Sequence, residues 1–75
     1  MRLSDLQGKD VVEIINGKKI GNIIDIIINE HGSIESLIVE KKKIITFLSS
    51  DNDLEVKWDQ INKIGEDVIL VNLIK

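Results

Sequence analysis

A few side chains in this sequence have types that could bind a transition metal or move a proton. His31 follows Glu30 in the segment NEHGS, and an imidazole beside a carboxylate can act as a metal ligand or a general base. The chain has no second histidine and no cysteine to complete a usual ligand set. We therefore interpret His31 as a solvated residue of a turn.

Acidic residues alternate in the segment DNDLE, where Asp51, Asp53 and Glu55 lie two residues apart. This spacing resembles the start of a calcium-binding loop, which needs a glycine at its sixth position and a bidentate glutamate at its twelfth. Counted from Asp51, those positions hold Val56 and Asn62. We expect a hairpin tip with solvated carboxylates, and we predict no metal site and no cofactor.

Asp25 interrupts an isoleucine-rich segment, which raises the possibility of a catalytic carboxylate. No other acid, base or nucleophile is spaced to act with it, so we predict no enzymatic activity. A partly buried carboxylate needs hydrogen bonds, and we expect Asp25 to accept them from backbone or lysine donors and to fix strand register. Asn22 needs a partner for the same reason.

Three consecutive lysines, Lys41 to Lys43, could contact phosphate groups. The chain nevertheless carries a net charge of -3, and it offers only Phe47 and Trp58 as aromatic platforms for stacked bases. We do not expect nucleic-acid binding, and we keep an RNA- or ribosome-associated accessory role as the alternative hypothesis.

Composition favours one small β domain spanning residues 1–75. Hydrophobic residues make up 43% of the chain, with one Trp, one Phe and no Tyr, so the core must consist of Ile, Val and Leu, which favour strands. Charged residues near the N-terminus argue against a secretory signal, and Gly21, Asn22 and Asp25 interrupt the longest isoleucine-rich stretch. We predict no membrane insertion and a cytoplasmic location, which the absence of cysteine fits.

Turn residues divide the chain into about six strands. Asn16–Gly17, residues 29–33 and residues 49–53 predict turns, and Gly65 begins another. We allow one short helical turn, capped by Asp59 and ended by Gly65. The alternating segment LEVKW predicts a strand with one buried face, formed by Leu54, Val56 and a core anchor at Trp58.

The isoleucine-rich strand is apolar on both faces. By strict alternation, one row would fill the core, namely Ile20, Ile24, Ile26 and Ile28. The opposite row would contain Gly21, Ile23, Asp25, Ile27 and Asn29. A chain this small cannot cover two faces, so we predict an interface formed by Ile23, Asp25 and Ile27.

Several motifs, in order along the chain, resemble the PRC-barrel superfamily, and more narrowly its small stand-alone YlmC/YmxH-type sporulation proteins. These motifs are the LQGK opening, the spacing of Gly21, Ile23 and Asp25, and the tail W-x-Q-I-x-K-I-G-x-D-x-I. The resemblance implies an all-β fold, a small six-stranded PRC-type β-barrel with at most one short helical turn. The same fold occurs in the photosynthetic reaction-centre H subunit and in a ribosome maturation factor.

The resemblance also implies a docking role, since it provides no catalytic residues to transfer. We therefore expect a non-enzymatic protein-interaction module that is associated with sporulation and self-associates as a homodimer. The sequence does not identify a protein partner.

Overall fold

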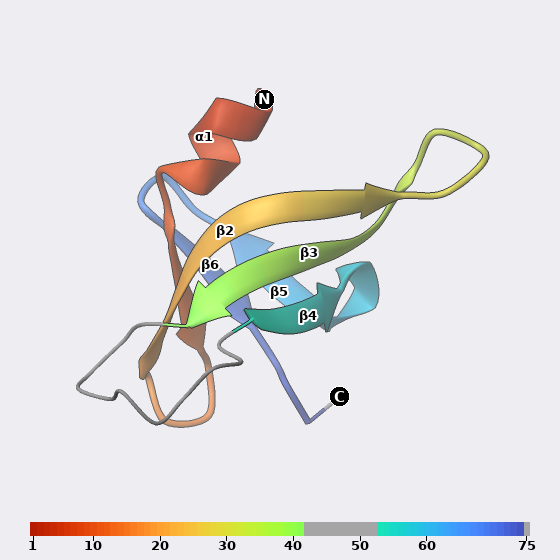
Figure 1. The fold of residues 1–75 in the computed structure, drawn as a ribbon. Helices are drawn as coiled ribbons and strands as arrows, with labels where there is room; N and C mark the ends of the chain where they lie inside the picture. Colours follow the sequence, from red (N-terminus) through yellow and green to blue (C-terminus); the bar gives the residue numbers. More distant parts are fainter. Residues whose placement is uncertain (42–52, 75) are drawn as a thin grey trace.

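The computed structural model describes residues 1–41 and 53–74 (Figure 1). Its elements, in chain order, are α1 (Leu3–Gln7), β1 (Asp10–Glu13), β2 (Lys19–Ile28), β3 (Ile34–Lys41), β4 (Asp53–Lys57), the 3-10 turn η1 (Trp58–Gln60), β5 (Ile61–Ile64) and β6 (Val68–Val71).

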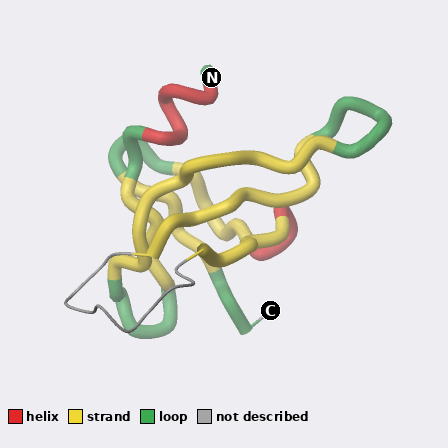
Figure 2. The backbone as a smooth tube through the Cα atoms, in the orientation of Figure 1, coloured by secondary structure: helices red, strands yellow, loops and turns green. Residues whose placement is uncertain are grey.

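The six strands form one sheet in the order β4-β3-β2-β1-β6-β5. All neighbouring pairs are antiparallel except β1 and β6, which run parallel. The sheet curls so that β5 and β6 lie behind β2 and β3 (Figures 1 and 2). The predicted six-stranded all-β fold is confirmed. The sheet is not closed, however, because β4 and β5 are its two edges and do not pair with each other. Only the short turn η1 separates these two strands in the sequence.

Two of the four predicted turns form around glycines with positive φ. The turn predicted at Gly65 links β5 to β6 without positive φ, and most of the turn predicted at residues 49–53 lies outside the described residues. Gly17 has φ 70° and donates its N–H to the carbonyl of Glu13 at 2.8 Å, closing the turn between β1 and β2. Gly32 has φ 83° in the turn between β2 and β3. Asn16 does not adopt positive φ; its side-chain oxygen instead accepts the Lys18 N–H at 2.9 Å.

Residues 1–41 and 53–74 contain two short helical segments, one more than the sequence predicted. Helix α1 was not predicted; the Arg2 N–H donates to the Asp5 carboxylate at 2.7 Å at its start, and Leu6 is buried in the core. The predicted helical turn after β4 ends at Gln60 and not at Gly65. Asp59 lies inside this turn and is not its N-cap, a position held by Lys57.

The core lies inside the curled sheet and consists of aliphatic side chains from α1 and five of the strands. Its buried members are Leu6, Val11, Ile23, Leu37, Val39, Val56, Ile69 and Val71. Val56 is fully buried and Leu54 packs against the core, as predicted. The prediction of Trp58 as the core anchor is wrong, because its residue is 43% exposed. Strand alternation ends at Lys57, where the chain turns into η1.

Candidate protein-interaction surface

The predicted interface residues lie on two different faces of β2. Asp25 and Ile27 are exposed, but Ile23 is only 2% exposed and belongs to the core. The pairing of β2 with β3 shifts register between Ile23 and Asp25, where Ile24 is the extra residue of a β-bulge. A bulge of one residue exchanges the two faces of the strand beyond it. The assignment of Ile23 to the outer face is therefore corrected, and Asp25 and Ile27 retain theirs.

The predicted core row of β2 is wrong for two of its four isoleucines. Ile24 and Ile28 are 43% and 56% exposed, although strict alternation placed both in the core. Ile20 and Ile26 are partly buried and do pack against the core. The buried residues of β2 are Gly21 and Ile23, both before the bulge, and after it Ile26 is partly buried. Ile28 is exposed because β2 ends there, on the part of the hairpin that projects from the molecule.

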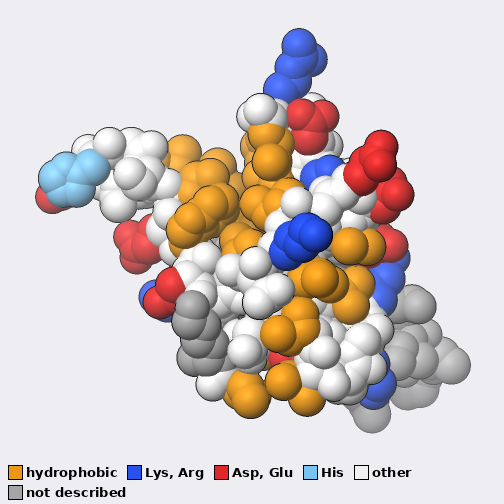
Figure 3. Space-filling view, turned by 180° about the vertical axis from the view of Figure 1, so that it is seen from behind, with side chains coloured by type: hydrophobic (Ala, Val, Ile, Leu, Met, Phe, Trp, Pro, Cys, Tyr) orange, Lys and Arg blue, Asp and Glu red, His pale blue; other side chains and the backbone are white. Residues whose placement is uncertain are grey.

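Beyond the bulge, β2 and β3 extend as a hairpin that projects from the rest of the molecule (Figure 1). We call residues 24–34 the arm. Three of its isoleucines, Ile24, Ile27 and Ile28, are among the exposed large hydrophobic residues, as is Leu3 of the adjacent α1. Seen from behind, hydrophobic side chains gather along the arm and on α1 (Figure 3). Because exposed apolar side chains are concentrated there, the arm is the candidate interaction surface of the described residues.

The turn at the tip of the arm is ordered by hydrogen bonds. The side-chain oxygen of Asn29 accepts the N–H groups of His31 at 2.9 Å and Ser33 at 3.1 Å. The Asn29 N–H donates to the carbonyl of Ser33 at 2.9 Å. These bonds hold the tip of the arm in one conformation.

His31 and Asp25 have the surroundings of surface residues. The His31 imidazole is 79% exposed, and its Nε2 lies 3.8 Å from a carboxylate oxygen of Glu30. Asp25 accepts the Ile26 N–H at 2.8 Å, so its partner is a backbone donor, as expected. The expectation that Asp25 is partly buried is wrong, because the residue is exposed. Within residues 1–41 and 53–74, no group of three His, Asp or Glu side chains could hold a metal ion.

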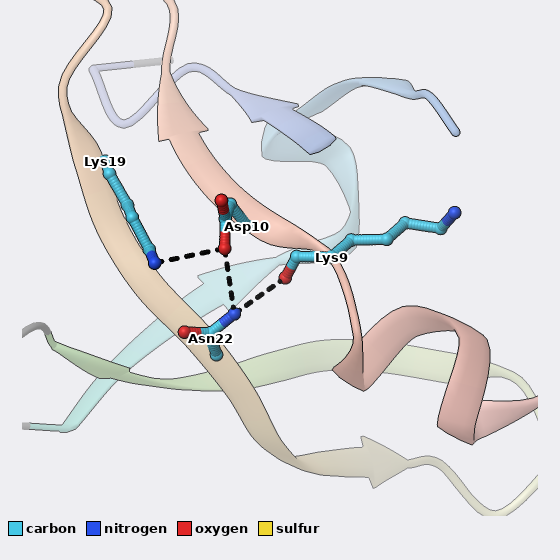
Figure 4. A network of polar contacts seen from close by, with 4 residues as sticks. All are labelled: Lys9, Asp10, Lys19 and Asn22. Atoms are coloured by element: carbon cyan, nitrogen blue, oxygen red, sulfur yellow. Dashed lines mark hydrogen bonds and ion pairs between the residues drawn. The ribbon is translucent and has the colours of Figure 1, made fainter. Parts of the chain in front are cut away.

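The base of the hairpin is fixed by a polar cluster (Figure 4). The Asn22 amide donates to the carbonyl of Lys9 at 3.0 Å and to the carboxylate of Asp10 at 3.2 Å. Lys19 forms an ion pair with the same Asp10 oxygen at 3.1 Å. The expectation that Asn22 needs a partner is confirmed, and its contacts tie β2 to the start of β1.

Sequence reasoning missed the structural role of Glu13. This residue is 8% exposed; its carboxylate accepts the N–H of Leu73 at 3.0 Å and also the N–H of Ile15. It thereby fastens the segment after β6 to the turn after β1. The sequence could have indicated this burial, because side chains alternate along a strand and Glu13 follows the buried Val11 by two residues on the same face.

A shallow recess lies where β3, β4 and η1 meet, beside the exposed indole of Trp58. It is lined by Glu35, Glu55, Lys57, Trp58, Asp59 and Gln60. Glu55 accepts a hydrogen bond from Ser36 at 2.6 Å and pairs with Lys57 at 3.8 Å. Because Glu55 already bonds to Ser36 and Lys57, its contacts do not support a calcium site at Asp51, Asp53 and Glu55.

Some residues singled out in the sequence lie outside the described part of the chain, namely Asp51, Phe47, Lys42 and Lys43.

The family model of the PRC-barrel domain matches residues 1–75. The chain belongs to the PRC-barrel family. It is 47% identical over 73 residues to a Bacillus subtilis protein named "Probable sporulation protein YlmC", covering 95% of this chain and 90% of the relative. It is 36% identical over 76 residues to the uncharacterized Bacillus subtilis protein YmxH, covering 97% and 89%. An uncharacterized Clostridium acetobutylicum protein is 38% identical over 71 residues, covering 93% and 82%.

The resemblance to the PRC-barrel superfamily is therefore confirmed. Among the helices in the described part of this PRC-barrel protein, none is long and apolar enough to cross a membrane.

Proposed function

We propose that this PRC-barrel protein is a non-enzymatic docking module that works during spore formation in the cytoplasm and self-associates through its arm. The observation that carries the proposal is the exposure of Ile24, Ile27 and Ile28 within five residues of one projecting strand. The sporulation context is taken from the name of the relative YlmC, and it is part of the proposal.

A second copy of the chain is the occupant that this surface fits best. In a two-fold dimer the same patch lies on both subunits, so an apolar arm meets an apolar arm. The three isoleucines and Leu3 are 37–56% exposed and together present roughly 300 Å² of apolar surface. A standard interface buries about 800 Å² per partner, so these residues would form its centre and polar arm residues its rim.

The alternative, an RNA- or ribosome-associated role, has less support. Lys41 is the one described member of the lysine run, and the chain carries a net charge of -3. Retention on RNA that is lost as salt rises would favour that role over protein docking.

Sedimentation equilibrium on the parent and on the double variant Ile27→Lys/Ile28→Lys tests self-association. We expect the parent to dimerise at high micromolar concentration, and the variant to stay monomeric with an unchanged melting temperature. The matched control is Ile15→Lys, because Ile15 is 61% exposed in the turn between β1 and β2. A strictly monomeric parent, or equal loss in the control, would overturn self-association through the arm.

Affinity capture from sporulating cells tests docking on other proteins. A tagged parent should retain proteins that the arm double variant does not retain. Identical sets of captured proteins from both baits would count against docking through the arm.

A further inference from the structure

The recess beside Trp58 combines an exposed aromatic ring with an excess of negative charge. Trp58 is 43% exposed, although tryptophan is highly buried on average in folded proteins. Three carboxylates line the same recess, from Glu35, Glu55 and Asp59, against the single ammonium group of Lys57. An aromatic face flanked by carboxylates attracts a cation through the ring quadrupole and through charge pairing.

The carboxylates differ in their remaining capacity to bind a ligand. One oxygen of Glu55 is already used by Ser36 at 2.6 Å and by Lys57 at 3.8 Å. Glu35 and Asp59 are exposed, and neither forms an ion pair with another of the described residues. These two carboxylates are the ones available to an incoming cation.

The backbone around the recess is fixed before a ligand arrives. Gln60 uses both ends of its amide inside the protein, accepting the Lys57 N–H at 2.8 Å and donating to the carbonyl of Leu73 at 3.2 Å. Its own carbonyl accepts the Asn72 N–H at 2.8 Å. These bonds anchor the backbone of η1, which carries Trp58, so the backbone needs little ordering on binding.

Glu35 is placed at the recess by a second irregularity of the sheet. The β2–β3 register passes from Ile27 opposite Ser36 to Ile28 opposite Ile34, which leaves Glu35 as the extra residue of a bulge. The β3–β4 register pairs Ser36 with Lys57, so its continuation sets Glu35 opposite Trp58. Bulges commonly redirect a side chain beside a functional site.

We propose that the Trp58 recess binds an arginine side chain of a partner protein. A guanidinium group is planar, so it can stack on the indole and still donate two parallel hydrogen bonds to a carboxylate. It is also more weakly hydrated than an ammonium group, which favours it at a half-exposed ring. This inference rests on the proposed docking role, but it concerns a surface separate from the arm.

Trp58 provides a direct readout, because the chain has one Trp and no Tyr. The test titrates the full chain with three capped peptides, Gly-Arg-Gly, Gly-Lys-Gly and Gly-citrulline-Gly, and follows Trp58 fluorescence. We expect the arginine peptide to bind saturably with a Kd on the order of millimolar. The lysine peptide should bind more weakly, and the uncharged citrulline peptide should give no saturable change.

Variants identify the site. Glu35→Gln and Asp59→Asn should each weaken binding of the arginine peptide by about two- to five-fold, as expected for one exposed charge pair. Glu30→Gln makes the same charge change at the arm tip and should leave Kd unchanged. If Glu35→Gln lowers the melting temperature, Asp59→Asn alone decides the result.

Three outcomes would overturn the proposal: equal binding of the citrulline peptide, equal binding of the lysine peptide, or equal weakening in Glu30→Gln. Failure of the docking role is measured separately. If the arginine peptide does not bind, sedimentation can still show that the arm self-associates. If the parent is monomeric in sedimentation, the titration can still show that the recess binds arginine.

Discussion

Gly21 of β2 packs directly against the backbone of Glu40 in β3. A Cβ atom at position 21 would overlap the carbonyl oxygen of Glu40 and lie 2.8 Å from its carbonyl carbon. This close approach lies within the longest pair of strands of the sheet, β2 and β3.

Gly21→Ala should destabilise the protein by about 3 kcal/mol or more, because backbone atoms would have to move to admit the methyl group. Urea denaturation followed by circular dichroism measures the change. Gly8→Ala is the control, since its Cβ would meet Ser4 O at an ordinary 3.6 Å. Equal stability of the two variants would show that β2 and β3 can separate at this point at little cost.

Ile23→Lys should unfold the domain or cost at least about 3 kcal/mol, because it places an unpaired charge in the core. Ile27→Lys, four residues along the same strand, should cost less than about 1 kcal/mol. Thermal melts of both variants at low concentration separate folding from association. Similar melting temperatures would mean that the bulge does not exchange the faces of β2.

Glu13→Gln should cost about 1–3 kcal/mol, even though it removes a charge. The carboxylate accepts two backbone N–H groups, whereas the amide of glutamine would direct its own N–H group at one of them. The exposed Glu30→Gln is the reference for the charge change in denaturation experiments. A Glu13 variant as stable as that reference would exclude a clamping role for the carboxylate.

Trp58→Ala should cost roughly 1–2 kcal/mol, less than the 3–5 kcal/mol typical of a fully buried aromatic residue. Leu37→Ala, at a residue only 1% exposed, should cost about 2–5 kcal/mol. Far-ultraviolet circular dichroism melts compare them without relying on Trp fluorescence. The reverse order of stability would restore Trp58 as the core anchor.

Asn22→Asp should cost about 1–3 kcal/mol, because the new carboxylate would face the Lys9 carbonyl and the Asp10 carboxylate (Figure 4). Asn62→Asp makes the same change at an exposed position of β5. Denaturation midpoints of the two variants in matched buffer measure the difference. No difference between them would mean that the polar cluster adds nothing to stability.

The sequence by itself determined what depends on local chemistry. Isoleucine and valine content predicted strands, and glycines predicted the turns at Gly17 and Gly32, because few other residues adopt positive φ. Asn22 was recognised as needing a partner, since a polar group within an apolar strand must be hydrogen-bonded. Ordered motifs along the chain were enough to indicate the family.

Tertiary structure decided which face each isoleucine of β2 occupies. Alternation has a period of two, so one extra residue at Ile24 exchanges the faces and sets Ile23 in the core. Ile28 is exposed for a different reason, because β2 ends there on the projecting arm. Nothing local marks that bulge, because it depends on how β3 pairs with β2. The burial of Glu13 and the recess at Trp58 likewise depend on segments distant in sequence, the residues after β6 and the start of β3.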